Sequence, residues 1–355
     1  MSVPDLRDAP AVGTRIDAFD AVDRSAPYGV QLRQTREAAA VFRRDFLSTG
    51  QPASVDTRDL ITLPYPTRFG LWRAALTPSP YLSITNRMQV IRFGGKVLVF
   101  EPSDFDSGEA TPYFARLNAQ TPSMIQDRIV TRHATVAQNL QSLGIQPEEV
   151  DYLAFDHLHT QDVRTWIGTS TQAPYFPNAT LIVQRDELAA IAELHPLQLP
   201  FYQPATYTDL RLDAIAAIDG DVLLGPGVAL LATPGHTFGN QSLVLSTSEG
   251  IWAISENVIA VECLVPEHSK IPGVAKAAKT WTREVILNTN TPEALADQYN
   301  SCVKEKAIVD VSQRDSRFPQ FLPSSELTPS AVFPGTKPTF THRSITHRSV
   351  TPRSA

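Results

Sequence analysis

Two histidine-bearing segments, each directly after an apolar run, constrain the fold of this chain more than any other feature. The first reads His-Leu-His-Thr-Gln-Asp at residues 157–162 and follows the largely apolar residues 150–155. The second reads Thr-Pro-Gly-His-Thr-Phe-Gly at residues 233–239 and follows residues 228–232. A short apolar run is typical of a buried β-strand. Imidazoles are therefore expected at the ends of two strands of a layered protein.

The histidines of these segments, His157, His159 and His236, form a candidate metal site. Side chains two apart on an extended backbone point to the same side, and Gly235 lets the chain turn tightly before the third histidine. Three neutral imidazoles suit a first-row transition metal, and a fourth position left open to water makes such a site catalytic. The His-x-His pair alone is weak evidence, because chance gives about 0.2 such pairs in a chain of this histidine content. The strands before both segments strengthen it.

Composition narrows the classes of function. The 355 residues are 42% hydrophobic and 19% charged, as in an ordinary soluble globular protein. A net charge of −6, from 31 basic and 37 acidic residues, argues against a nucleic-acid surface. Cys263 and Cys302 are the only cysteines and do not make a disulfide scaffold. The first 17 residues are polar, and no run approaches the ~18 apolar residues of a membrane span, so we expect a cytoplasmic protein without a membrane partner.

The rest of the chain mixes helices and strands. Two apolar runs joined by Gly94-Gly95 predict a β-hairpin over residues 88–100. Helices are predicted at residues 31–46, 134–143, 186–194 and 291–304, the last from its Thr-Pro-Glu start. Further strands are predicted at residues 60–63, 70–74, 179–183, 222–224, 228–232, 242–245, 251–254 and 307–311. This order is neither strictly alternating nor all-β, and it indicates a layered α/β protein with mixed sheets.

The composition divides the chain into three parts. Residues 1–78 are predicted as an N-terminal extension, with a helix and the first strands, that covers the cleft or forms a dimer contact. Residues 79–320 form the main domain, in which an aromatic-rich loop at 201–207 would suit a small, partly apolar substrate. Residues 321–355 are rich in Pro, Ser, Thr and Arg and are predicted as a disordered tail, with metal binding by its repeated Thr-His-Arg-Ser motif as the alternative.

The two histidine segments resemble the metallo-β-lactamase fold superfamily. The family pattern is His-x-His-x-Asp-His after a strand, with Thr-Pro-Gly-His-Thr-x-Gly later in the chain. Residues 144–153, and residues 176–179 followed by Glu187, are also similar to the family's usual sequence around these motifs. The resemblance covers about residues 80–315. It implies an α/β fold, an αβ/βα four-layer sandwich of two mixed β-sheets flanked by helices, with metal in the cleft at one edge.

The chain departs from the family pattern at the second metal. Where the family has an aspartate and a histidine, this chain has Gln161 and Asp162. Glu256 stands where a bridging aspartate is usual. No histidine directly follows the last predicted strand, and His268 is the candidate substitute. The resemblance therefore implies that the three histidine ligands of the first metal are present. It also implies that the ligands of the second metal are replaced by residues with oxygen donors.

Together these observations predict a metal-dependent hydrolase in which His157, His159 and His236 hold one divalent transition metal that activates water. Asp162 and Glu256 are predicted as additional ligands or as the catalytic base. Zinc is the first choice of metal, while iron or manganese and a second, oxygen-rich site stay open. The predicted partner is a small-molecule substrate, an ester, lactone or amide, and a homodimer stays open. The alternatives are a non-catalytic binding protein with a degenerate cleft and a mononuclear iron oxygenase.

Overall fold

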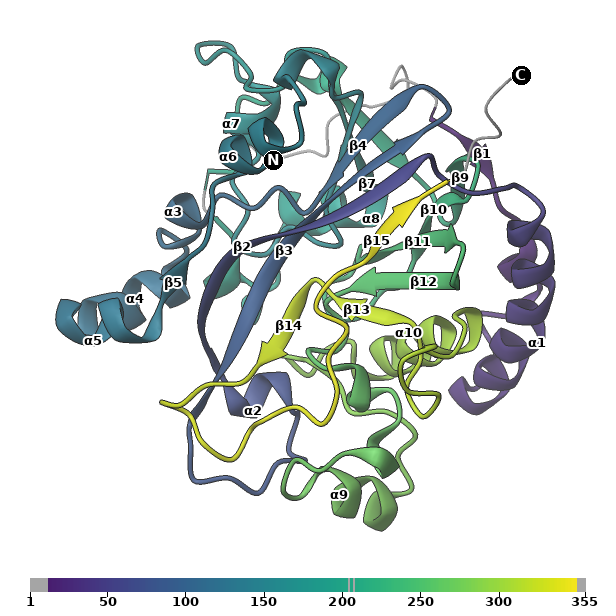
Figure 1. The fold of residues 1–355 in the computed structure, drawn as a ribbon, viewed down its shortest axis with the longest axis vertical. Helices are drawn as coiled ribbons and strands as arrows, with labels where there is room; N and C mark the ends of the chain where they lie inside the picture. Colours follow the sequence, from purple (N-terminus) through teal and green to yellow (C-terminus); the bar gives the residue numbers. More distant parts are fainter. Residues whose placement is uncertain (1–11, 204, 207, 350–355) are drawn as a thin grey trace.

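Two β-sheets packed face to face, with helices on their outer faces, make up the computed structural model (Figure 1). It describes residues 12–349 except 204 and 207. One sheet has six strands in the order β1-β9-β10-β11-β12-β13, which are Thr14–Arg15, Val222–Gly225, Val228–Ala232, Gln241–Thr247, Gly250–Ser255 and Phe321–Pro323. The other has nine strands, in the order β15-β2-β3-β4-β6-β7-β8 with β14 on β3 and β5 on β2. These are Thr346–Arg348, Ser54–Pro66, Tyr81–Phe93, Lys96–Phe100, Tyr152–Ala154, Thr180–Gln184, Ile215–Ile218, Ser325–Thr328 and Thr131–Arg132.

Helices cover the outer faces of both sheets, and further short helices lie outside these layers. The α-helices are α1 Tyr28–Leu47, α2 Thr67–Gly70, α3 Phe105–Gly108, α4 Pro112–Gln120, α5 Ser123–Ile129, α6 Val136–Ser142, α7 Arg164–Ile167, α8 Arg185–Ala192, α9 Val274–Trp281 and α10 Leu295–Ile308. Side chains of α1 and α10 share one apolar cluster with the six-stranded sheet. Side chains of α6, α7 and α8 share another with the nine-stranded sheet. The segment α3–α5 stands at the edge of the molecule in Figure 1.

Alternation along the central strands explains the layers. In β10, Val228 and Leu230 belong to the cluster between the sheets, whereas Ala229 and Leu231 belong to the cluster beneath α1 and α10. Successive side chains of a strand point to opposite faces, and here both faces are covered. A strand buried on both sides needs an apolar residue at every position, which is why these strands read as unbroken apolar runs. The predicted layered α/β architecture with two mixed sheets is confirmed.

Most predicted elements are present. The helix predicted at 31–46 is α1, and the hairpin predicted at 88–100 is β3–β4, with Phe93 opposite Lys96 across the glycine turn. The helix predicted at 134–143 is α6, which starts with a capping box between Thr135 and Gln138. The strand predicted at 228–232 is β10. These segments carry their structural signal in local residue pattern and turn chemistry.

Three predicted elements differ from the structure. Residues 70–74 are the end of α2 and a turn rather than a strand, because Phe69 of α2 turns into the core. The helix predicted from Thr291 begins at Leu295, since the Thr291 hydroxyl accepts a hydrogen bond from Gln198 rather than capping the helix. The strand predicted at 307–311 is absent, because α10 continues to Ile308 and Val311 then forms an isolated bridge with Pro319.

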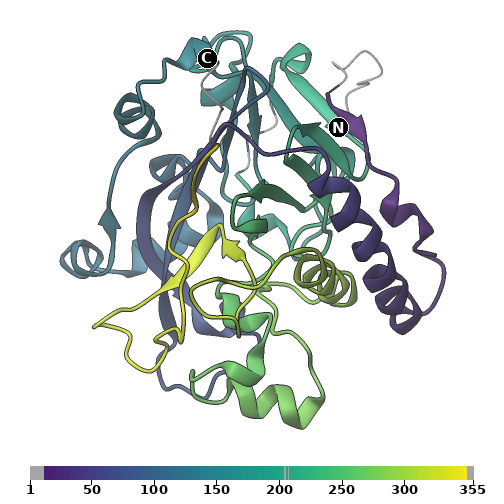
Figure 2. The ribbon, with the colours of Figure 1, turned by 45° about the vertical axis from the view of Figure 1, so that its right-hand side comes forward.

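The described residues beyond 320 are folded, so the prediction of a disordered tail is wrong for them. Strand β13 extends the six-stranded sheet, while β14 and β15 pair with β3 and β2 of the nine-stranded sheet (Figure 2). Phe321, Leu322, Leu327 and Ile345 are buried apolar anchors hidden in an otherwise polar composition. The repeated histidines are buried: the ring of His342 packs against Trp252 at 4.6 Å between centroids, and Nε2 of His347 contacts Pro52 O at 3.2 Å. Residues 350–355 lie outside the described residues.

The described part of the N-terminal region also belongs to the layers. Helix α1 packs against α10, and β2 pairs with β3 from Ser54 to Pro66. Side chains of β2 and α2, among them Tyr65 and Phe69, line the cavity described below. The dimer contact stays a prediction. Within residues 12–203, 205–206 and 208–349, no helix combines the length and the apolar character needed to cross a membrane.

Candidate metal centre

The two histidine segments come from different sheets and meet at one edge of the sandwich. His157 and His159 lie in the loop after β6, and His236 lies in the loop between β10 and β11. Gln241, the first residue of β11, joins the loops, because its backbone N–H donates to Asp156 O at 2.8 Å and its side chain donates to Phe155 O at 2.8 Å. The strand-end placement predicted from sequence is therefore present.

Glycine makes the second loop possible. Gly235 has a φ of +137°, which favours glycine, and a Cβ there would lie 2.2 Å from the Cα of Gln298 in α10. The loop is therefore packed directly against this helix. His236, the next residue, is held within this tight turn with 2% of its surface exposed.

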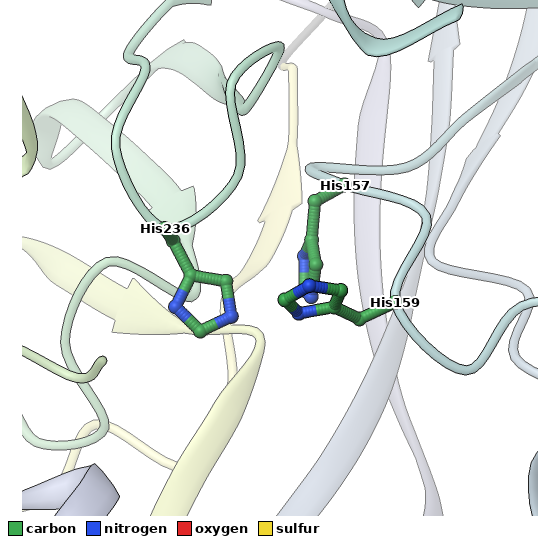
Figure 3. Close-up of side chains that lie close together, drawn as sticks. All are labelled: His157, His159 and His236. Carbon is green, nitrogen blue, oxygen red and sulfur yellow. The ribbon is translucent and has the colours of Figure 1, made fainter. Parts of the chain in front are cut away.

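Three imidazoles face one another across the meeting point (Figure 3). Ring centroids are separated by 4.8 Å for His157 and His159, 4.6 Å for His157 and His236, and 5.2 Å for His159 and His236. One nitrogen of each ring lies within 4.8 Å of a nitrogen of the other two. This spacing suits a common cation bound by three nitrogens at about 2.1 Å each.

A protein acceptor fixes the second nitrogen of each ring. Nδ1 of His157 contacts Asp156 Oδ1, Nε2 of His159 contacts Gln198 Oε1 at 2.7 Å, and Nδ1 of His236 contacts Asn288 O at 2.8 Å. Each acceptor holds the N–H of its ring and leaves the other nitrogen free to act as a ligand. Such outer partners orient metal-binding histidines in proteins, so the donor set fits a divalent transition metal.

Burial and a neighbouring carboxylate set the charge of the rings. Burial lowers the pKa of His236 to about 3 and holds the pKa of His159 well below its usual value. Burial also disfavours a charged His157, but the carboxylate of Asp156 outweighs this and raises the pKa of His157 to about 9. Two rings are therefore neutral at pH 7, and a metal ion would have to displace a proton from the third.

Two carboxylates lie beside the rings, one of them buried and the other partly buried. Oxygens of Asp156 and Glu256 lie within 4.8 Å of each other and of a nitrogen of His157. Two consecutive serines hold these carboxylates: Ser324 donates to Asp156 Oδ2, and Ser325 donates to Glu256 Oε2 at 2.7 Å. Burial raises the pKa of Glu256 to about 7, although the charge of His157 opposes this. Glu256 thus lies beside the triad, and its role as ligand or base stays a prediction.

The structure does not bring the remaining candidates to the triad. Both oxygens of Asp162 pair with the guanidinium of Arg164 two residues later, at 2.9 Å for Oδ1 and Nε, and Asp162 does not line the cavity. Gln161 does line it, and its amide donates to Ser103 Oγ at 2.9 Å. His268 packs near Phe318 instead, with 6.3 Å between ring centroids.

Sequence reasoning missed four residues that hold the site. Asp156 and Glu101 each follow an apolar strand closely, so the rule that located the histidines could have found them. Glu101 accepts from the backbone N–H of Asp156 at 2.5 Å. Asn288 and Gln198 lie in irregular segments and carry no such signal. Asn288 holds His236 through its backbone carbonyl, a group that a residue of any type would supply, and its side-chain amide donates to Glu256.

A cavity of about 360 Å³ opens from the triad. Its inner end is polar and is formed by the three histidines with Glu101, Ser103, Gln161 and Glu256. Apolar side chains of β2, α4 and α5 make up much of the remaining lining, among them Ile61, Leu63, Tyr113, Phe114, Leu117 and Ile129, with polar Asn118, Thr121 and Gln126 between them. Phe201 of the aromatic-rich loop also lines it, while Pro204 and Tyr207 lie outside the described residues. The cavity therefore combines a cluster of potential metal ligands with a largely apolar lining.

Comparisons with known proteins agree with this arrangement. No family model matches the chain. An N-acyl homoserine lactonase from Bacillus sp. is 31% identical over 120 residues, which are 34% of this chain and 42% of that protein. The lactonase from Bacillus cereus is 31% identical over 131 residues, 35% of this chain and 41% of that protein. The chain thus spans about two fifths of the length of the curated relatives it matches.

Solved structures extend the comparison to the whole fold. AidC, a dizinc quorum-quenching lactonase, superposes with a TM-score of 0.51 at 12% identity, over 81% of this chain and 94% of that one. A probable metal-dependent hydrolase from Staphylococcus aureus gives a TM-score of 0.51 at 11% identity, over 70% of this chain and 83% of that one. With its two mixed sheets, flanking helices and histidines at the strand ends, the chain has the metallo-β-lactamase fold.

Proposed function

We propose that this protein is a metal-dependent hydrolase that cleaves a small ester or lactone carrying an apolar substituent. The observation that carries the proposal is the convergence of His157, His159 and His236 in the wall of a cavity whose lining is otherwise largely apolar. The curated relatives named N-acyl homoserine lactonases support the same class of substrate. An amide fits the same cavity, and we rank it after the ester and lactone because those relatives are lactonases.

We propose one zinc ion as the resident metal. Three imidazoles with an open fourth position are a usual zinc donor set. The residues at the family's second-metal positions support a single ion, because Asp162 is paired with Arg164 and the amide of Gln161 donates to Ser103. A second ion would have to use Asp156 and Glu256, and the first of these already holds His157 and accepts from Ser324.

The chain's own residues supply binding and proton transfer. A bound divalent ion lowers the pKa of a water molecule towards ~7. Glu256, held by Ser325 and Asn288, would take a proton from the attacking water and would return it to the leaving oxygen as the acyl C–O bond breaks. Asp156 keeps the His157 ring in one orientation while this happens.

The charged residues that line the cavity indicate which class of substrate it can bind. No lysine or arginine is among the described residues that line it, whereas Glu101, Asp104, Glu109 and Glu256 are. Phosphate oxygens are normally recognised by cationic side chains or by ordered backbone N–H groups. The cavity therefore favours a neutral carbonyl substrate over a phosphoester.

The test combines metal analysis with a substrate panel. Protein purified without a histidine tag should contain about one zinc per chain and should hydrolyse esters or lactones but not phosphodiesters. Chelation should abolish this turnover, and added zinc should restore it. Iron with oxygen uptake would point to the oxygenase alternative, and protein that binds no metal would point to the non-catalytic alternative. The cytoplasmic location and the homodimer stay predictions.

A further inference from the structure

We infer that Glu187, a residue outside the triad and the cavity lining, is the positioning residue that sets the spacing between the two histidine-bearing loops. The inference rests on the proposed function, because it concerns the metal site described above. Glu187 lies in the first turn of α8 with 1% of its surface exposed. Its hydrogen bonds go to neighbours of the histidines and not to the rings themselves. We infer its role from the hydrogen bonds that its two carboxylate oxygens accept.

Each oxygen of Glu187 holds a different loop. Oε1 accepts from the backbone N–H of Leu158, the residue between the first two histidines, at 2.9 Å. Oε2 accepts from Thr237 Oγ1 at 2.7 Å and from the backbone N–H of Gly239 at 3.1 Å, in the loop that carries the third histidine. One carboxylate thus links a loop of the nine-stranded sheet to a loop of the six-stranded sheet.

A fourth contact extends the link to the aromatic loop. The hydroxyl of Tyr202 donates to Glu187 Oε1 at 2.8 Å. The ring of Tyr202 packs edge-on against His159, with 4.8 Å between centroids. The position of the second imidazole is therefore fixed from two sides, through the backbone of Leu158 and through this tyrosine.

The contacts leave the carboxylate little freedom. An ionised carboxylate offers about four acceptor sites, and four donors occupy them here. Hydrogen bonds to a charged acceptor are stronger than neutral ones, and the start of a helix favours a negative charge. The second loop also packs against the helix itself, because a Cβ on Gly239 would lie 2.1 Å from the backbone nitrogen of Glu187.

This geometry predicts an effect on metal binding beyond an effect on stability. Metal–ligand distances tolerate only about 0.2 Å, and the three ligands are divided between the two loops that Glu187 links. If the link is weakened, His236 can move relative to His157 and His159 while each sheet stays folded. The affinity for metal should then fall more than the stability of the metal-free protein.

The test is Glu187→Gln with Glu262→Gln as the matched control. In the glutamine variant, one acceptor oxygen becomes an amide that faces donors, so one loop loses its contacts. Glu262 is also a buried carboxylate, and it holds Ser269 and Thr339, neither of which belongs to a histidine loop. Zinc affinity is measured by competition with a chelator, and the coordination geometry is measured from the visible absorption of the Co²⁺ form.

We expect Glu187→Gln to weaken zinc binding about 10- to 100-fold, as loss of an outer partner does at other metal sites, and to change the Co²⁺ spectrum. Glu262→Gln should lower the metal-free melting temperature by a similar amount and leave both metal readouts unchanged. Wild-type zinc affinity and Co²⁺ spectrum in Glu187→Gln would overturn the inference alone. A wild-type protein that binds neither ion would overturn the proposed function first.

A milder variant keeps the test decisive if Glu187→Gln does not fold. Thr237→Val removes one donor and keeps the carboxylate and the other three contacts. It should weaken zinc binding several-fold, and Glu187→Asp, which keeps both oxygens on a shorter arm, should retain more affinity than Glu187→Gln. Unchanged affinity in Thr237→Val would count against the link between the loops.

Discussion

The two walls of the cavity differ in how firmly they are built. On the histidine wall, the three ligands are at most 6% exposed, and each ring has a hydrogen-bond partner that is itself held by the fold. On the opposite wall, α4 and α5 contain no buried residue, although Tyr113, Leu117 and Ile129 line the cavity. The chemistry is therefore placed on a rigid edge of two sheets, and the apolar wall is placed on a segment with little packing behind it.

The difference has a physical consequence for function. A metal site requires ligand positions that do not drift, and dense packing with satisfied hydrogen bonds provides them. An apolar wall gains its stabilisation when a substrate covers it, so it can be loosely packed without one. The segment α3–α5 is attached near its end by the short β5–β2 pairing and by the ion pair between Arg132 and Glu109. Substitutions in the segment α3–α5 should therefore change substrate preference and leave the metal site intact.

The largest expected effect concerns the metal ligands. His236→Ala should reduce bound zinc from about one per chain to nearly none and lower ester or lactone turnover by about 10³-fold or more, because two imidazoles alone do not hold the ion or its water. Elemental analysis and steady-state kinetics measure both. The control is His268→Ala, which lies outside the cavity. Full zinc content in His236→Ala would contradict the assignment.

The next largest effect shows whether Glu256 is a metal ligand or the catalytic base. Glu256→Gln should lower turnover about 10²- to 10⁴-fold, since the amide cannot take a proton, while the zinc content should stay near one per chain. Glu267→Gln is the control, because this exposed carboxylate does not line the cavity, and it should change turnover little. If Glu256→Gln loses its zinc as well, Glu256 is a ligand rather than the base.

A third effect probes the packing behind the histidine wall. Burial raises the pKa of Glu305 to about 7, although Ser242, Ser255 and Asn257 donate to its Oε1. A carboxyl group with a raised folded-state pKa stabilises the fold below its unfolded pKa, near 4.5, and loses that contribution as the pH rises through 7. The loss is about 3 kcal/mol between these limits.

Glu305→Gln mimics the protonated group and should remove this dependence. Its free energy of unfolding relative to wild type should therefore rise between pH 4.5 and pH 8, as urea denaturation at several pH values would measure. Glu262→Gln provides a buried comparison, because burial also raises the pKa of Glu262 while three donors from Ser269 and Thr339 oppose the shift. Parallel pH profiles for Glu305→Gln and wild type would contradict the burial argument.

A smaller effect is expected on the apolar wall. Leu117→Ala removes about 1 kcal/mol of contact with a long acyl chain, which corresponds to about a fivefold loss of kcat/KM for that substrate. Short-chain substrates, zinc content and melting temperature should be unaffected. Leu76→Ala is the control, because this leucine is exposed outside the cavity. Equal losses for short and long chains would argue that α4 shapes the metal end instead.

The smallest effect concerns Asp162, which the sequence predicted as a metal ligand or catalytic base. Asp162→Asn should leave zinc content and turnover unchanged, because Asp162 pairs with Arg164 rather than with the triad. Loss of this partly exposed pair should cost about 0.5 kcal/mol of stability. Urea denaturation and elemental analysis check the two statements. Loss of zinc in this variant would return Asp162 to the ligand set.

The sequence predicted the features that are local and left out those that depend on distant contacts. The strand-end positions of His157, His159 and His236 followed from apolar runs, and the place of Glu256 followed from the family resemblance. The position of Asp162 could not be predicted, because its pairing with Arg164 depends on the path of the loop after β6.

Composition misled where a few buried residues decide the structure. The segment beyond 320 reads as disordered because Pro, Ser, Thr and Arg dominate it, yet Phe321, Leu322 and Leu327 are fully buried. Edge strands need few apolar anchors, since the sheet supplies their hydrogen bonds. The acceptor role of the Asn288 carbonyl had no sequence signal at all, because backbone atoms are the same in every residue.

The two serines that hold Asp156 and Glu256 lie at positions 324 and 325, between the end of β13 and the start of β14. Both serines follow the two histidine-bearing loops in the sequence and are therefore synthesised after them. Folding of the earlier strands alone therefore leaves two acidic groups beside the rings without their hydroxyl donors. The two carboxylates beside the rings therefore gain these hydroxyl donors only when the chain after β12 has packed against the site.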